Sequence, residues 1–155
     1  MTWEVFLSQI AIGGITAVIA ALITVHFAIK RYISEKLWEK RAEAYGAILE
    51  ALHDMKRYPD GLLDSYEPGR EISEGQKKEL FAKYHEGKHE LNRRVEVEQF
   101  FLADNLLTEI STLSKNLVSA RNTDDGYSIV DDYFDAINKA QKKIRAIAKD
   151  HLAVR

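Results

Sequence analysis

One motif in the chain has the residue types and spacing of a catalytic metal site. Residues 85–89 read His-Glu-Gly-Lys-His and match the pattern H-E-x-x-H. On a helix, His85 and His89 would share one face and could bind Zn²⁺, while Glu86 would activate a bound water for peptide hydrolysis. Read literally, the motif predicts a metalloprotease.

The residues around the motif do not resemble a metalloprotease helix. Such a helix normally packs inside the protein with uncharged residues at its variable positions, but here these are Gly87 and Lys88, and Lys83 and Glu90 continue a polar surface. No downstream motif supplies a third metal ligand, so one would have to come from Glu96, Glu98 or Glu109. We therefore keep the protease only as a third hypothesis, and predict no catalytic residue, no metal and no cofactor.

The element that precedes this region is an uncharged run from Val5 to Ile29. As a helix it would be about 37 Å long, more than the roughly 30 Å hydrocarbon core of a bilayer. A secretory signal peptide would begin with basic residues, whereas the only charged side chain before this run is Glu4. The sequence therefore predicts an uncleaved, single-pass membrane anchor at residues 1–31. Residues 32–155 are enough for one compact domain.

Basic residues give the expected orientation of this anchor. All 22 Lys and Arg residues lie at position 30 or later, and five of them crowd the end of the apolar run: Lys30, Arg31, Lys36, Lys40 and Arg41. Because such residues favour the cytoplasmic side, we expect the N-terminus outside and residues 32–155 in the cytoplasm. The same five side chains could bind anionic lipid.

The composition of the chain bounds its partners. The expected cytoplasmic part has 22 basic and 23 acidic residues, so no overall positive field for nucleic acid is expected. The absence of cysteine excludes disulfides, thiolate metal sites and Cys nucleophiles, and fits a reducing cytoplasm. The expected partners are the lipid bilayer, a second copy of the chain and an unidentified protein.

Helical periodicity dominates the first part of the expected domain. An apolar stripe with spacings of mainly three and four follows the anchor, and predicts a helix that continues from the membrane: Trp38, Tyr45, Ile48, Leu52 and Met55. Pro59 and Gly61 are expected to end it. A capping box at Ser73 and Gln76 then predicts a second helical region from about Glu74.

The second helical region extends to about Ala120, with a bend or break expected at Gly87 or at Val95 to Val97. It carries a wide apolar surface that we expect to be mainly core, with a partner surface as the alternative: Phe100, Phe101, Leu102, Leu106 and Leu107. After a turn-rich loop at residues 121–127, a last helix is predicted. No segment alternates with period two, so the predicted fold is all-α, an antiparallel bundle of three or four helices.

Small residues recur every fourth position in the anchor, at Gly13, Ala17 and Ala21. Such spacing lets two helix backbones approach closely in lipid. This pattern predicts that the anchor self-associates.

The first sixty residues also resemble a known group of proteins. The residues that carry the likeness are Gly13-Gly14 in the apolar run, the basic flank, Ser34 to Tyr45 and Leu52 to Tyr58. They look like small uncharacterised bacterial proteins with a single inner-membrane anchor. The resemblance implies a bacterial inner membrane and supplies no activity or site residues.

Two main hypotheses for function remain. The first is a non-enzymatic helical module, anchored in the membrane, that self-associates or recruits a partner at the cytoplasmic face. The second is an oligomeric effector of a toxin or defence system that perturbs the membrane. The lack of charged residues within the span argues against an ion-conducting lining.

Overall fold

The computed structural model describes residues 3–122 and 125–153, with side chains from residue 17 onward. Four α-helices and one short 3₁₀ helix make up the structure: α1 (Trp3–Ser65), α2 (Glu74–Glu98), η1 (Gln99–Phe101), α3 (Asp104–Ala120) and α4 (Gly126–Leu152). None of the described residues lies in a strand, as predicted. The chain divides into two units, Met1–Glu39 and Lys40–Arg155, which we call unit 1 and unit 2.

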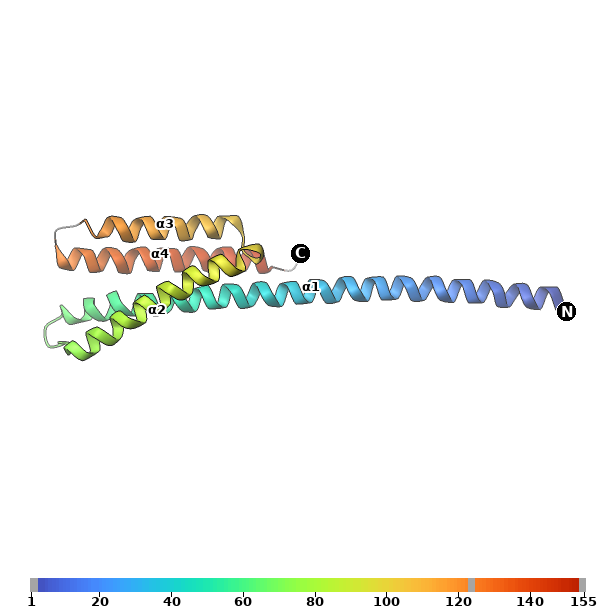
Figure 1. The fold of residues 1–155 in the computed structure, drawn as a ribbon, viewed down its shortest axis with the longest axis horizontal. Helices are drawn as coiled ribbons and strands as arrows, with labels where there is room; N and C mark the ends of the chain where they lie inside the picture. The colour runs from blue at the N-terminus through green and yellow to red at the C-terminus, as the bar shows by residue number, and fades with distance from the viewer. Residues whose placement is uncertain (1–2, 123–124, 154–155) are drawn as a thin grey trace. The chain divides into compact units, whose positions relative to one another are not determined.

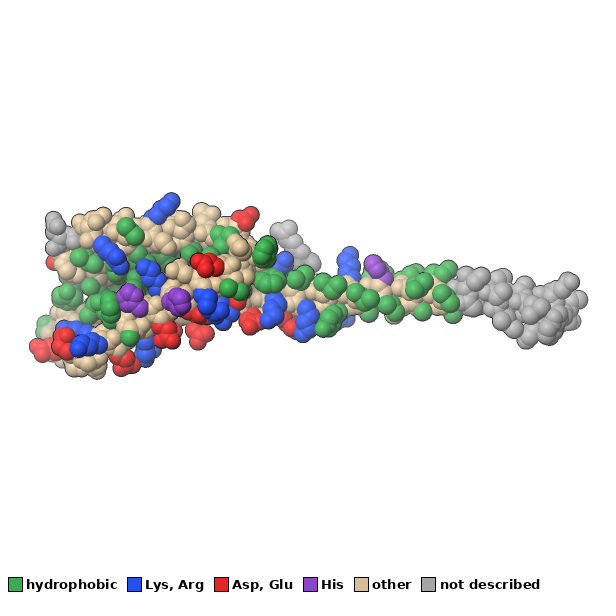
Figure 2. Space-filling view, viewed as in Figure 1, with side chains coloured by type: hydrophobic (Ala, Val, Ile, Leu, Met, Phe, Trp, Pro, Cys, Tyr) green, Lys and Arg blue, Asp and Glu red, His purple; other side chains and the backbone are tan. Residues whose placement is uncertain are grey.

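Unit 1 consists of the N-terminal part of α1, and every described side chain in it is exposed. Its large apolar side chains are between 41% and 65% exposed. They are Val18, Ile19, Leu22, Ile23, Val25, Phe27, Ile29, Tyr32, Ile33, Leu37 and Trp38. In Figure 2, hydrophobic side chains cover the described part of this helix before the first basic ones and continue among them. The placement of Trp38 in a buried stripe was therefore wrong.

The described part of α1 meets the length and composition requirements of a membrane span. The apolar stretch lies within Ala17–Ser65, and none of it is buried in the structure. A signal sequence or the core helix of a soluble protein can meet the same requirements. The absence of burial makes this stretch different from the core helices of unit 2.

Unit 2 has one hydrophobic core, to which all four α-helices contribute. The α1 stripe Tyr45, Ile48, Leu52 and Met55 is fully buried, as its spacing predicted. From α3 and α4 the core receives side chains at steps of three and four: Leu106, Ile110, Leu113 and Leu117, then Ile137, Ala140, Ile144 and Ala148. Figure 1 shows α3 and α4 side by side and antiparallel.

Three residues expected to end or break helices lie inside them instead. Helix α1 continues through Pro59 and Gly61 to Ser65, and α2 continues through Gly87. A Cβ atom on Gly61 would lie 2.7 Å from Leu80 Cδ1, and one on Gly87 would lie 2.8 Å from the Ala51 carbonyl oxygen. These glycines therefore let α1 and α2 pack closely, and the break expected at Gly87 is wrong.

The ends of the later helices follow local signals. Ser73 Oγ accepts a hydrogen bond from the Gln76 backbone N–H, and the Gln76 side chain accepts one from Ser73 N–H, which is the predicted capping box. The Asp125 carboxylate caps α4 by accepting from Ser128 N–H at 2.9 Å. Because these bonds satisfy N–H groups without an intrahelical partner, α2 and α4 begin where they do.

The second helical region breaks after Glu98, at η1, and resumes as α3. This break directly follows Val95 to Val97, the second of the two places where a bend or break was expected. The apolar surface at this break is split between two environments. Leu102 and Leu106 are buried, whereas Phe100 is 88% exposed. The expectation that this surface is core therefore holds for Leu102 and Leu106 and is wrong for Phe100.

Candidate functional site

The five residues of the H-E-x-x-H motif face different surroundings on α2. His85 is exposed and its ring packs edge-on against Phe81, with ring centroids 4.4 Å apart. Gly87 faces the backbone of α1, and Lys88 points toward α3. His89 lies beside an open hollow between α1 and α2. The motif thus lies partly on the surface and partly at a helix contact.

The hollow beside His89 has several charged side chains around it. Glu86 of the motif also lines it, together with Glu50, Asp54, Glu90 and Arg94. The Glu90 carboxylate is held by Arg93 and Arg94, with N–O distances of 2.6 and 2.7 Å. Over the described ranges, no three His, Asp or Glu side chains are placed to hold a metal ion.

The basic side chains after the apolar run are mostly paired with glutamates on the same helix. Three salt bridges of 2.7 Å join neighbouring turns: Arg31 to Glu35, Lys36 to Glu39, and Lys40 to Glu43. Lys30 is exposed, whereas Arg41 is partly buried in unit 2. The glutamates at i+3 and i+4 were visible in the sequence, and they make this flank less positive than its five cations suggest.

The small-residue row of the anchor is described only in part. Ala17 and Ala21 are exposed, and the side-chain surroundings of position 13 lie outside the described residues. Thr24, one turn further on, donates its hydroxyl to the Ala20 carbonyl at 2.9 Å, which satisfies this polar group within the helix. The described part of the row therefore consists of two exposed alanines, Ala17 and Ala21.

A polar contact ties together three parts of unit 2 that are distant in sequence. The Tyr45 hydroxyl lies 2.8 Å from His151 Nδ1 and accepts a hydrogen bond from Ala103 N–H at 3.2 Å. This contact joins α1 to the start of α3 and the end of α4. Because burial disfavours the phenolate, the pKa of Tyr45 is raised. The hydroxyl therefore stays protonated at neutral pH.

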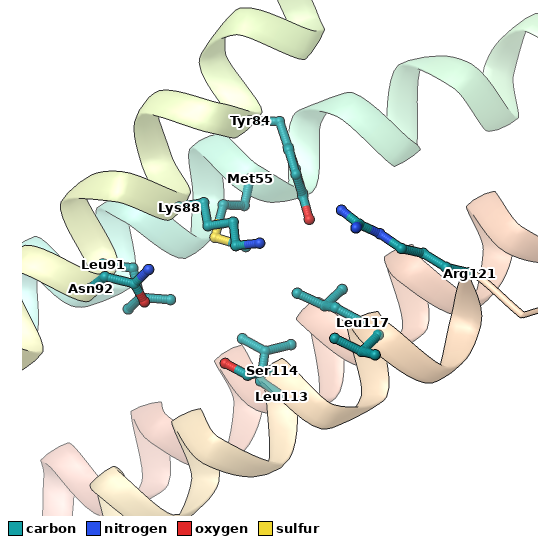
Figure 3. A pocket seen from close by; sticks show the side chains of 10 residues that line it. Met55, Tyr84, Lys88, Leu91, Asn92, Leu113, Ser114, Leu117 and Arg121 are labelled. Carbon is teal, nitrogen blue, oxygen red and sulfur yellow. The ribbon is translucent and has the colours of Figure 1, made fainter.

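A cavity of about 120 Å³ lies between α2 and α3 in unit 2, with Met55 of α1 contributing to its wall. Figure 3 shows its side chains. The apolar ones are Met55, Leu91, Leu113, Leu117 and Val118, and the polar ones are Tyr84, Lys88, Asn92, Ser114 and Arg121. We call this space the α2/α3 cavity.

Two cations and a phenol dominate the polar side of the α2/α3 cavity. In Figure 3 the Lys88 amine and the Arg121 guanidinium enter the same space from opposite sides. Burial is the main cause that raises the pKa of Tyr84 to about 12, and the nearby Tyr133 hydroxyl adds to it. Tyr84 therefore remains a neutral hydroxyl, able to donate a hydrogen bond.

The sequence contained one signal for this cavity that the motif search missed. Most lysines and arginines on α2 have a glutamate three or four residues away, as in the pairs Lys77–Glu74 and Lys83–Glu79. Lys88 instead has Tyr84, His85, Leu91 and Asn92 at those positions. A lysine without a local carboxylate is a candidate for a role outside its own helix. The partner, Arg121, follows α3 and could be placed only by the fold.

Comparisons with protein-family models, with curated proteins and with solved structures gave no match. The function must therefore be argued from the geometry of this chain.

Proposed function

We propose that the protein is a non-enzymatic helical module anchored in a bacterial inner membrane, which self-associates or recruits a partner protein at the cytoplasmic face. In this proposal the N-terminus is outside, and residues 32–155 form an antiparallel helical bundle in the cytoplasm. The observation that carries the proposal is the exposure of every described apolar side chain in unit 1.

The exposed apolar side chains of unit 1 would be unfavourable in water, so we expect lipid or another protein to cover them. Soluble monomers rarely expose continuous apolar patches larger than a few hundred Å². In unit 1 eleven large apolar side chains are more than two-fifths exposed, and they surround the helix rather than follow one stripe. A lipid bilayer covers a helix from all sides, whereas a single protein partner would cover one face. The arrangement therefore favours a membrane span.

The residues that flank the span support the proposed orientation. Lys30 and Arg31 end the uncharged run, and exposed Tyr32 follows at a position suited to the membrane interface. The Lys36 amine lies 6.0 Å from the centre of the Tyr32 ring, which keeps a cation beside this aromatic side chain. Lys and Arg follow the uncharged run and none precedes it in this sequence, and this asymmetry favours a cytoplasmic unit 2.

Anchoring and orientation can be tested with the full chain expressed in bacteria. We expect the protein to stay in the membrane fraction after alkaline carbonate extraction. The chain has no cysteine, so single-cysteine variants report on topology directly. A membrane-impermeant maleimide should label Thr2→Cys in intact spheroplasts and Glu71→Cys only after lysis. Release by carbonate, or the reverse labelling pattern, would refute the proposal.

Self-association can be tested on the same cysteine-free background. We expect Ala17→Cys and Ala21→Cys to form disulfide-linked dimers in membranes under mild oxidation. Ile19→Cys is the matched control, because at about 100° per residue it lies on the far side of the helix from Ala17. Equal cross-linking at all three positions would indicate random collision and remove the small-residue row from the proposal.

A further inference from the structure

The α2/α3 cavity contains positive charge without a negative partner. None of the ion pairs among the described residues includes Lys88 or Arg121. Arg121 donates through Nε to the neutral Tyr133 hydroxyl at 2.8 Å, which leaves its two terminal nitrogens without a protein acceptor in the described structure. No carboxylate lines the cavity.

The remaining polar groups of the cavity add donors to these two cations. The Tyr84 hydroxyl makes no hydrogen bond to another described residue, and its raised pKa keeps its proton. Asn92 of α2 and Ser114 of α3 supply an amide and a hydroxyl at the same space. Donors therefore reach the cavity from both helices.

The apolar wall strengthens any interaction with a bound anion. Leu113 and Leu117 are buried beneath the cations, and Leu91 closes the side toward α2. These leucines exclude water from one side of the site, while the exposed Asn92, Ser114 and Arg121 open its other side to solvent. The lower dielectric on the leucine side strengthens the attraction between a bound anion and the two cations. By contrast, three of the five cations of the basic flank have carboxylate partners on their own helix: Arg31, Lys36 and Lys40.

We propose that the α2/α3 cavity binds a phosphate-sized oxyanion, held between Lys88 of α2 and Arg121 at the end of α3. The volume of about 120 Å³ is below the roughly 300 Å³ at which sites for drug-sized ligands begin, so the bound group is small. A planar guanidinium pairs two of its N–H groups with two oxygens of one phosphate, and the ammonium and hydroxyl donors meet the others.

A bound anion would also link two helices. Lys88 and Tyr84 belong to α2, whereas Ser114 and Arg121 come from α3 and its end. Because only the folded unit 2 brings these groups together, anion binding stabilises it against unfolding. This inference concerns unit 2 alone and does not depend on whether unit 1 is anchored in a membrane.

The direct test uses inorganic phosphate and the full chain in maltoside micelles, which contain no phosphorus. We expect the ³¹P resonance of phosphate to broaden on addition of the wild-type protein. Lys88→Gln and Arg121→Gln should each weaken the apparent affinity roughly tenfold, the effect of losing one hydrogen bond to a charged group. Lys78→Gln on α2 and Lys115→Gln on α3 are matched controls, since both lysines are exposed and outside the cavity.

Thermal unfolding gives a second measurement that also shows whether each variant folds. Wild-type protein and the two control variants should melt a few degrees higher in sodium phosphate than in sodium chloride of equal ionic strength. The Lys88 and Arg121 variants should melt cooperatively in chloride and gain little from phosphate. No broadening with the wild-type protein, or equal responses from the cavity and control variants, would overturn the proposal.

The phosphate group could come from a free anion or from a lipid. Adding phosphatidic acid to the micelles distinguishes the two sources. If it displaces inorganic phosphate at far lower concentration, the cavity takes a lipid headgroup; if inorganic phosphate stays bound, the ligand is a free anion. Either result supports an oxyanion site at Lys88 and Arg121.

Discussion

The two units use the same kind of apolar side chain in opposite ways. In unit 1, Leu22 is 65% exposed, and in unit 2, Leu52 of the same helix is completely buried. Around Leu52 the apolar residues follow one stripe with polar residues between them, whereas around Leu22 they surround the helix. The stripe therefore lies in a packed protein core, whereas the apolar side chains around Leu22 are exposed on all sides, and for these we propose a lipid bilayer as the surrounding medium.

The most severe test of this comparison truncates one leucine in each unit. Leu52→Ala should lower the free energy of unfolding of unit 2 by about 2–5 kcal/mol, since it leaves a cavity in a packed core. Leu22→Ala should change it by less than about 0.5 kcal/mol. Urea unfolding of the full chain in micelles, followed by circular dichroism, measures both. Similar losses for the two variants would mean that unit 1 packs on a protein core.

A second test compares two glycines of unit 2. Gly87→Ala places a Cβ atom 2.8 Å from the Ala51 carbonyl oxygen, and we expect this overpacking to cost about 1–3 kcal/mol. Gly46→Ala has nothing within 4 Å and should raise stability by about 0.5–1 kcal/mol through helix propensity. The same urea titration applies. If both variants gain stability, α1 and α2 do not pack as closely at Gly87 as the structure shows.

A third test removes one hydroxyl from the contact that joins three parts of unit 2. Tyr45→Phe should cost about 1–2 kcal/mol, because Ala103 N–H loses its acceptor and His151 loses its partner. Tyr127→Phe is the control, since this tyrosine is 48% exposed. It should change stability by less than about 0.5 kcal/mol. Equal thermal midpoints for the two variants would show that the Tyr45 contact does not hold α4 in place.

The smallest effect concerns the exposed charges of α2. Hydrogen bonds from Arg93 and then Arg94 lower the pKa of Glu90 to about 2. Because this is below the unfolded value of about 4.3, the contribution of Glu90 to stability is present above about pH 4.5 and is lost as the pH falls toward 2.

Acid titration of unfolding measures this contribution. The stability difference between wild type and Glu90→Gln should shrink as the pH falls from 5 to 2, by a small amount, since exposed ion pairs contribute little. Glu96→Gln, at an exposed glutamate without an ion pair among the described residues, should parallel the wild type. A constant difference for Glu90→Gln across this range would contradict the assigned pKa.

Local patterns predicted the parts of the fold that depend on near neighbours in sequence. The stripe from Tyr45 to Met55 and the capping box at Ser73 were correct because both depend on residues three or four positions apart on one helix. Gly61 and Gly87 were misread as helix breakers. Their role depends on Leu80 and Ala51, which lie on the opposite helix and have no fixed spacing from them in the sequence.

The candidate sites divide in the same way. The motif at residues 85–89 was evident from spacing, but spacing could not show that Gly87 faces α1 while Lys88 faces α3. The domain boundary at residue 31 came from the end of an apolar run, whereas the packed unit begins at Lys40. Residue 31 marks the end of the predicted membrane span, and Lys40 marks the start of the packed unit.

By itself the sequence determined that this chain is helical, that residues 5–29 carry no Asp, Glu, Lys or Arg and form an apolar run long enough to cross a bilayer, and that one face of each later helix is apolar. Each of these properties follows from residues that are close together in the sequence. Only the tertiary structure decided which glycines lie at helix contacts and that Lys88 and Arg121, 33 positions apart, share one cavity without a carboxylate. The physical reason is that a site between helices depends on their relative position, which no local period encodes.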